Sequence, residues 1–267
     1  MITFVSTPIG NLKDISLRAL EVLKDADIIF CEDTRHSVKL LNAYEIKKPL
    51  QSCHKFNERK AAVKIISAAK EGKKVAVISD AGMPVVSDPG NAVCAALREA
   101  GMEYTIVPGA NAALSALVLS ALPADRFIFL GFLPDKSGEK SALLNKYKYL
   151  DCTLIFHVAP QDIERDIAAM YSAFGDRPAC AVREITKLHE ECVPFTLAEG
   201  YKGERRGEFV IVVGGAEDRG NPLNLLPERE HILHYMGEGL DKKAAIKRAA
   251  KDRGVSKSEL YKFSIDL

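Results

Sequence analysis

Residues 74–90 read KVAVISDAGMPVVSDPG, an apolar strand-like run followed by a long loop with two aspartates, two prolines and two glycines. The run at 74–79 is apolar on both faces, as a strand covered by helices on both sides requires. A plain connector needs only about four to six residues, and this loop is longer. Glycine permits close main-chain contact with a ligand, and proline stiffens a loop before binding. The stretch therefore predicts a ligand-binding loop at the end of a buried strand.

Similar apolar runs recur along the chain and alternate with segments of helical period. The other strand-like runs are ITFVS (2–6), DIIFC (27–31), EYTIV (103–107), RFIFLG (126–131), TLIFHV (153–158), ACAVRE (179–184) and EFVIVV (208–213). The apolar helical stripes expected to face the core are Leu17, Leu20 and Leu23, and Val63, Ile66 and Ala69. This alternation predicts an α/β fold with largely parallel strands.

Two breaks divide the chain. Pro and Asp at 122–125 separate an N-terminal α/β domain (1–122) from a second, smaller one (123–216), and a Gly/Asn/Pro-rich stretch at 214–222 follows. The remainder, 220–267, predicts a basic helical domain. Within it, a helix ends at Gly254, and Ser256 with Glu259 forms a capping box for the next helix.

Composition is that of an ordinary soluble globular protein, with 47% hydrophobic and 27% charged residues in 267. No apolar run approaches the roughly 18 residues of a membrane helix, and no secretory signal is visible. The six cysteines form no C-x-x-C pair, which favours reduced thiols in the cytoplasm and no metal site. Positive charge is concentrated in residues 241–267, which hold eight Lys/Arg against four Asp/Glu.

Three more loops follow predicted strands, where open α/β sheets bind their ligands. The loop at 6–11, STPIGN, is neither a dinucleotide fingerprint nor a P-loop, and alone it fits a tight turn. The loop at 31–36, CEDTRH, crowds five polar groups, more than a helix cap or an Arg35–Glu32 ion pair needs. The loop at 108–113, PGANAA, opens a helix of small residues, which suits either a flat ligand or close helix–sheet packing.

Together these loops resemble the tetrapyrrole-methylase-like methyltransferases, and within them the bacterial enzymes that 2′-O-methylate a cytidine of 16S ribosomal RNA. The stretches that carry the resemblance are STPIGNLKDISLRAL (6–20), CEDTRHS (31–37), HKFNE (54–58), SDAGMPVVSDPG (79–90), LPADRF (122–127), GFLP (131–134), VREITKLHE (182–190) and RRGEFVIVV (205–213). The resemblance implies a two-domain α/β homodimer that binds S-adenosylmethionine between its domains and acts on 16S rRNA or the small ribosomal subunit.

By motif position, the resemblance also implies a set of donor-binding residues. These are Pro8, Ile9, Asp80, Gly82, Met83, Asn111, Ala112, Val182 and Phe209. For the acceptor, removal of the hydroxyl proton needs a base. The candidates are the pair Glu32 and Asp33, ranked first, and Glu184.

Phosphate contacts are expected from basic side chains, because guanidinium groups bind phosphate bidentately and basic helices bind it through charge. The candidates are Arg35, Arg183, Lys187, Lys243, Lys247 and Arg248. An ordinary ion pair at the end of a strand is a nearly equal interpretation of Arg183 and Glu184.

One segment departs from the family. After the strand at 153–157, relatives usually show Tyr/Phe-Glu-Ser-x-His-Arg, whereas this chain has HVAPQD at 157–162. Two alternatives stay open. The same donor loops would serve a C-methyltransferase of tetrapyrrole synthesis, and the departure at 157–162 suggests an RNA-binding relative that has lost catalysis.

Overall fold

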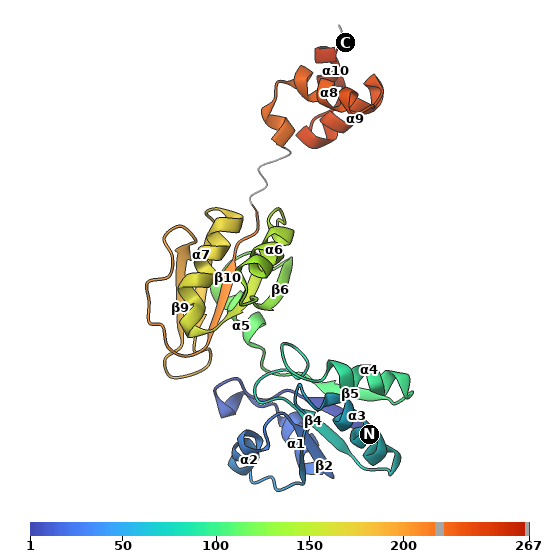
Figure 1. Cartoon of the computed structure of the whole chain (residues 1–267), viewed down its shortest axis with the longest axis vertical. Helices are drawn as coiled ribbons and strands as arrows, with labels where there is room; N and C mark the ends of the chain where they lie inside the picture. Colours follow the sequence, from blue (N-terminus) through green and yellow to red (C-terminus); the bar gives the residue numbers. More distant parts are fainter. Residues whose placement is uncertain (217–221, 265–266) are drawn as a thin grey trace. The chain divides into compact units, whose positions relative to one another are not determined.

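The computed structural model describes residues 1–216, 222–264 and 267, which fall into two compact units, Met1–Gly215 and Ala216–Leu267 (Figure 1). The first unit contains two five-stranded sheets, and the second contains helices. In the part of the chain that is described, no helix is long and apolar enough to cross a membrane.

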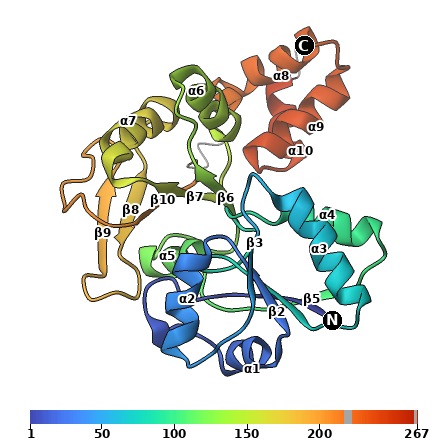
Figure 2. The same cartoon turned by 60° about the horizontal axis from the view of Figure 1, so that its bottom comes forward.

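The first sheet is wholly parallel, in the order β3-β2-β4-β1-β5. Its strands are β1 (Ile2–Val5), β2 (Ile28–Cys31), β3 (Leu50–Ser52), β4 (Val75–Ile78) and β5 (Tyr104–Val107). Its helices are α1 (Leu17–Asp25), α2 (Thr34–Ala43), α3 (Glu58–Lys70) and α4 (Asn91–Glu99), with a 3-10 turn η1 (Leu12–Asp14). Alternate residues of β4 pack on opposite sides: Val75 and Val77 meet α3 and α4, while Ala76 and Ile78 meet α1 and α2 (Figure 2). The predicted helix-covered strand at 74–79 is therefore confirmed.

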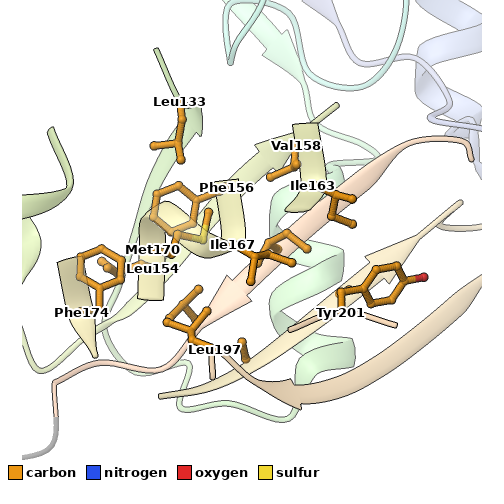
Figure 3. Packing of buried hydrophobic residues seen from close by; sticks show 14 of the residues in the cluster. Leu133, Leu154, Phe156, Val158, Ile163, Ile167, Met170, Phe174, Leu197 and Tyr201 are labelled. Carbon is orange, nitrogen blue, oxygen red and sulfur yellow. The ribbon is translucent and has the colours of Figure 1, made fainter. Parts of the chain in front are cut away.

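The second sheet is mixed, in the order β6-β7-β10-β8-β9. Its strands are β6 (Phe127–Phe132), β7 (Thr153–Val158), β8 (Pro178–Arg183), β9 (Glu191–Thr196) and β10 (Phe209–Val213). Its helices are α5 (Ala112–Ser120), α6 (Ser137–Tyr147) and α7 (Ile163–Phe174), with a 3-10 turn η2 (Pro160–Asp162). One face packs on α6 and α7 through Leu144, Phe156 and Met170 (Figure 3), and the other packs on α5.

The expectation of largely parallel strands is wrong for this second sheet. Only β6 and β7 run parallel; β10 lies antiparallel to both β7 and β8, and β8 to β9. Strands β3 and β9 were not predicted. Both are edge strands without a continuous apolar run, and β9 contains Pro194, which only an edge strand tolerates.

The predicted helical stripes identify the helices but not their buried faces. Leu17 is exposed on α1, whose buried residues are Ala19 and Leu23. Val63 is exposed on α3, whose buried face is made mostly of alanine. Small side chains let a helix lie close to the sheet, so the larger apolar residues do not mark the buried face here.

The second unit contains α8 (Glu228–Gly237), α9 (Lys242–Arg253) and α10 (Lys257–Tyr261), with 3-10 turns η3 (Pro222–Leu225) and η4 (Lys262–Ser264). Gly254 ends α9 in the left-handed conformation, and the Ser256–Glu259 capping box is present. Both predictions for this region are confirmed. Ile232, Ile246 and Leu260 form the centre of a small separate core.

A buried ion pair joins α6 and α7. Lys140 and Asp166 are both about 95% buried and their side chains pair directly. Removing one partner of a buried pair leaves an uncompensated charge, which typically costs about 3–5 kcal/mol.

We therefore expect Lys140→Met to lower the free energy of unfolding in urea by about 3–5 kcal/mol. The double variant K140M/D166L should recover most of this loss, because no charge is then left buried. Lys136→Met is the matched control, since Lys136 makes only an exposed ion pair with Glu139 and should change stability by less than about 1 kcal/mol. Equal losses in K140M and K136M would contradict the interpretation.

Candidate active site

The carboxyl ends of β1, β4 and β5 lie side by side, because β1 pairs in parallel with both neighbours. The loops at 6–11, 79–90 and 108–113 therefore emerge at one edge of the sheet. The first two are joined by main-chain hydrogen bonds: Thr7 N–H donates to Gly82 O at 2.9 Å, and Gly82 N–H donates to Thr7 O at 3.1 Å. Three loops distant in sequence thus meet at the place where an α/β sheet binds ligands.

The loop at 79–90 holds an unusual backbone conformation. Gly82 and Gly90 have φ of +76° and +133°, which glycine adopts at little cost. Val85 and Ser87 also have positive φ, of +78° and +64°. A β-branched residue in this region costs about 1–3 kcal/mol and persists only where the surroundings enforce it, which is common at functional sites.

A cavity of about 370 Å³ opens where these loops face the second sheet. Its lining residues come from the three loops, from β6, β7 and β10, and from the segments after β7, after β8 and before β10. They are Ile9, Ala81, Gly82, Met83, Val86, Ser87, Asp88, Asn111, Ala112, Ala113, Phe129, Phe132, His157, Val158, Ala159, Pro160, Ile185, Gly207, Glu208, Phe209 and Val210. The volume lies in the range usual for small-molecule sites, and the lining is mainly apolar with few polar groups, as such sites typically are.

Six of the nine predicted donor-binding residues line this cavity: Ile9, Gly82, Met83, Asn111, Ala112 and Phe209. The structure places the other three just behind its wall. Pro8 is buried beside Ile9. Asp80 accepts a hydrogen bond from the main-chain N–H of Asp33 at 3.1 Å, so it ties two loops together. Val182 is buried in the core and packs against Val210, and Val210 lines the cavity.

Asn111 begins helix α5. Its side-chain oxygen accepts from the main-chain N–H of Leu114 at 3.0 Å, so the side chain caps the helix. The small residues Ala112 and Ala113 then present the first turn of α5 to the cavity. A helix start favours negative charge, and this end of the cavity therefore suits a carboxylate.

The three predicted catalytic carboxylates are placed differently. Asp33 caps α2 and forms an ion pair with Arg35, so Arg35 does not pair with Glu32. The hydrogen bonds from Arg35 lower the pKa of Asp33 to about 2. Burial and the nearby charge of Asp80 raise the pKa of Glu32. Neither Glu32 nor Asp33 is among the cavity-lining residues. A carboxylate with a pKa near 2 is a weak base, so Asp33 is poorly suited to proton removal.

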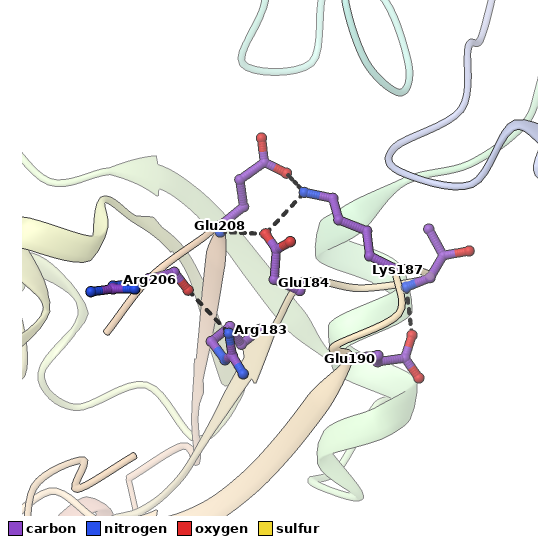
Figure 4. A network of polar contacts seen from close by, with 7 residues as sticks. Arg183, Glu184, Lys187, Glu190, Arg206 and Glu208 are labelled. Atoms are coloured by element: carbon purple, nitrogen blue, oxygen red, sulfur yellow. Dashed lines mark hydrogen bonds and ion pairs between the residues drawn. The ribbon is translucent and has the colours of Figure 1, made fainter. Parts of the chain in front are cut away.

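Glu184 belongs to a network of charges at the carboxyl end of β8 (Figure 4). Its Oε1 accepts from Lys187 Nζ and from the main-chain N–H of Glu208, both at 2.9 Å. Burial would raise the pKa of Glu184, but these hydrogen bonds leave it lowered. Lys187 also pairs with Glu208, and Arg183 pairs with Glu191 at 3.0 Å. The interpretation of Arg183 and Glu184 as an ion pair with each other is therefore wrong: Arg183 pairs with Glu191, and Glu184 pairs with Lys187.

Asp88 lies in the cavity wall and was not singled out as a base from the sequence. Burial, together with the charge of Glu32, raises the pKa of Asp88 to about 6. A base with a pKa close to the working pH is the most effective one. The available signal was the place of Asp88 in an Asp-Pro-Gly sequence within a long loop. The strained conformation of that loop could not be predicted from its residue types.

The aromatic part of the wall was also missed. Phe129 and Phe132 of β6 and His157 of β7 line the cavity together. The sequence placed Phe129 and His157 in strands and Phe132 directly after one, but gave no indication of which strand ends would meet. Among the residues described, no group of three or more His, Cys, Asp and Glu side chains is placed to hold a metal ion.

The predicted phosphate-binding residues differ in accessibility. Lys243, Lys247 and Arg248 are exposed on α9. The side chain of Arg35 is 88% exposed but pairs with Asp33. Arg183 and Lys187 are largely covered and engaged in the network at β8. Helix α9 therefore offers the most accessible cations of the predicted set.

A family profile for tetrapyrrole (corrin/porphyrin) methylases matches residues 1–200. The chain belongs to this family. Curated relatives named ribosomal RNA small subunit methyltransferase I include one from Bacillus subtilis, 41% identical over 96% of this chain and 91% of its own length. Another, from Thermotoga maritima, is 43% identical over 80% of this chain and 97% of its own length.

Solved structures of the family share the fold at low sequence identity. The methyltransferase CobJ matches with a TM-score of 0.62 at 20% identity, covering 80% of this chain and 94% of its own. Uroporphyrin-III C-methyltransferase from Thermus thermophilus, solved in complex with S-adenosylhomocysteine, matches with a TM-score of 0.57 at 19% identity, covering 80% of this chain and 96% of its own. The two-domain α/β fold predicted from the resemblance is confirmed.

We expect Asp80→Ala to weaken binding of S-adenosylhomocysteine by roughly tenfold, because it removes a charge beside the cavity and the acceptor that holds the main chain of Asp33. Asp80→Asn keeps an acceptor for that N–H while removing the charge, so it separates the two contributions. Isothermal titration calorimetry measures the affinities, and thermal unfolding checks the fold. Wild-type affinity in both variants would place the donor elsewhere.

Proposed function

We propose that this protein transfers a methyl group from S-adenosylmethionine to the 2′-hydroxyl of a cytidine in 16S ribosomal RNA, bound alone or in the small subunit. The observation that carries the proposal is the cavity where loops 6–11, 79–90 and 108–113 meet the second sheet. The relatives named as small-subunit rRNA methyltransferases supply the class of acceptor.

The test of the reaction uses donor with a labelled methyl group and 16S RNA or small subunits that lack the modification. Label on a ribose supports the proposal, and label confined to a base contradicts it. Transfer to a tetrapyrrole, with none to RNA, would favour the small-molecule alternative. S-Adenosylhomocysteine binding without transfer to either acceptor would favour the alternative that has lost catalysis.

When bound, S-adenosylmethionine supplies a methyl group on a sulfonium, which is already a good leaving group. The protein has to align the hydroxyl with the methyl carbon and remove the hydroxyl proton. Alignment in a shaped cavity is worth several kcal/mol, up to about 7–11 in model systems. The paired Thr7–Gly82 backbone and the strained loop around Val85 supply such fixed walls.

Asp88 is the best-placed base among the carboxylates. It lines the cavity, its pKa is raised to about 6, and it is therefore ionised at neutral pH yet more basic than an ordinary aspartate. Asp33 is weakened by Arg35, and Glu184 is occupied by Lys187. We assign proton removal to Asp88, whose pKa is raised by burial and by the charge of Glu32 outside the cavity wall.

We expect Asp88→Asn to slow single-turnover methylation by about 10²–10⁴-fold while S-adenosylhomocysteine affinity changes little. The wild-type rate should fall as pH drops through about 6, because protonated Asp88 cannot accept a proton; the variant should lose this dependence. Asp135→Asn, at an exposed site outside the cavity, is the control. An unchanged pH profile in Asp88→Asn would exclude Asp88 as the base.

A second consequence concerns stability. Since folding raises the pKa of Asp88, the folded state binds its proton more tightly than the unfolded chain, and stability falls as pH rises from about 4 to about 6. Asp88→Asn should therefore melt higher than the wild type at pH 8, with no such advantage at pH 3.5. A lower melting temperature at pH 8 would contradict the burial of this charge.

RNA contacts are assigned to α9. Lys243, Lys247 and Arg248 are exposed, and phosphate neutralisation makes binding fall with salt by a slope of roughly 0.7 per contact for single-stranded nucleic acid. The triple alanine variant should bind 16S RNA more weakly and lower the salt slope by about 2. Lys60, Lys64 and Lys70, exposed on α3, provide a control with the same change in charge. Equal effects of the two triple variants would indicate a general charge effect instead.

The remaining assignments concern assembly and compartment. Exposed apolar side chains gather on α5, where Leu114 and Val118 lie one turn apart, and on the edge strand β5 at Tyr104 and Ile106. Exposed apolar surface supports the homodimer that the family resemblance implies. An rRNA substrate supports a cytoplasmic location.

A further inference from the structure

His157 stands at the end of β7, where this chain departs from its family. Its ring lies edge-to-face against Phe129 at 5.0 Å and against Phe132 at 5.3 Å between centroids. All three rings line the cavity. The imidazole is therefore held in a fixed orientation between two phenyl rings that have no hydrogen-bonding group.

The Nε2 atom of this imidazole is buried and has no hydrogen-bond partner among the residues that the structure describes. Leaving a buried polar atom unsatisfied typically costs about 1–3 kcal/mol, and such exceptions need an explanation. Burial also lowers the pKa of His157, which favours the neutral ring. A neutral imidazole with its proton on Nδ1 presents Nε2 as a hydrogen-bond acceptor.

Two other polar side chains in the wall, Asn111 and Glu208, already have partners. Asn111 caps α5, and Glu208 pairs with Lys187. The wall near His157 is otherwise aromatic or aliphatic, through Phe129, Phe132 and Val158. A ligand group that fits here is flat and aromatic and carries an N–H donor at its edge.

We infer that His157 recognises the purine of the methyl donor: the ring packs against the aromatic wall, and Nε2 accepts a hydrogen bond from the 6-amino group. This inference rests on the proposed donor. It adds a specificity-determining side chain to the site, distinct from Asp88 and from the loops that carry the family resemblance.

The test compares S-adenosylhomocysteine with its 6-deamino analogue, in which hydrogen replaces the amino group. Calorimetry on the full chain should show that the wild type binds the analogue roughly three- to tenfold more weakly, the range of one neutral hydrogen bond. His157→Phe keeps the aromatic packing but lacks Nε2, so it should bind the two ligands equally. His189→Phe is the matched control, because His189 is exposed outside the cavity and should keep the wild-type preference.

Three results would overturn the inference: a wild type that binds both ligands equally, a His157→Phe variant that keeps the full preference, or a His189→Phe variant that loses it. His157→Gln, which retains a side-chain acceptor, guards against a folding defect in the phenylalanine variant and should keep part of the preference. Absence of S-adenosylhomocysteine binding in every protein, including the wild type, would instead refute the donor itself. If methyl transfer to RNA is normal but substitution of His157 does not change the preference for the 6-amino group, this inference is refuted and the proposed function stands.

Discussion

The pair of main-chain hydrogen bonds between Thr7 and Gly82 sets the geometry of the site. It forms an isolated antiparallel bridge beyond the ends of the parallel strands β1 and β4 and fixes two loops against each other. Gly82 is required there, because its φ is +76° and an added Cβ would lie 3.2 Å from the side chain of Ile9. Once these loops are joined, Ile9 and Met83 face the same cavity, and the rest of the long loop must turn sharply to reach α4. The strain at Val85 and Ser87 follows from that constraint.

The opposite wall depends on a second fixed segment. Glu184 and Thr186 both have positive φ, and Ile185 between them lines the cavity. Lys187 holds this turn through Glu184 and Glu208, while its side chain passes so close to Gly10 that an added Cβ there would lie 2.5 Å from Lys187 Cγ. Lys187 was predicted to bind RNA and Glu184 to remove the proton. In the structure both shape the cavity wall, and they join loop 6–11 to the second sheet.

Sequence reasoning located the loops that meet at the cavity because their signals are local. Glycine, proline and aspartate at the end of an apolar run mark a functional loop wherever the strand lies, as at 79–90. It failed where the outcome depends on long-range packing. The antiparallel course of β10 and the edge strand β9 have no local signal, and Val63 looked like a core residue although α3 buries its alanines instead. The same limit applies to Asp88: its pKa is raised by burial and, to a smaller extent, by the charge of Glu32, and both depend on how the fold places distant residues.

The segment 157–162 gains a physical meaning from its surroundings. The family pattern would place a glutamate, a histidine and an arginine along this stretch, whereas Val158, Ala159 and Pro160 here extend the apolar wall of the cavity. Burial lowers the pKa of His157, and a hydrogen bond accepted in such a buried place is stronger than one in water. The proposed function places the RNA contacts elsewhere, on the exposed cations of α9.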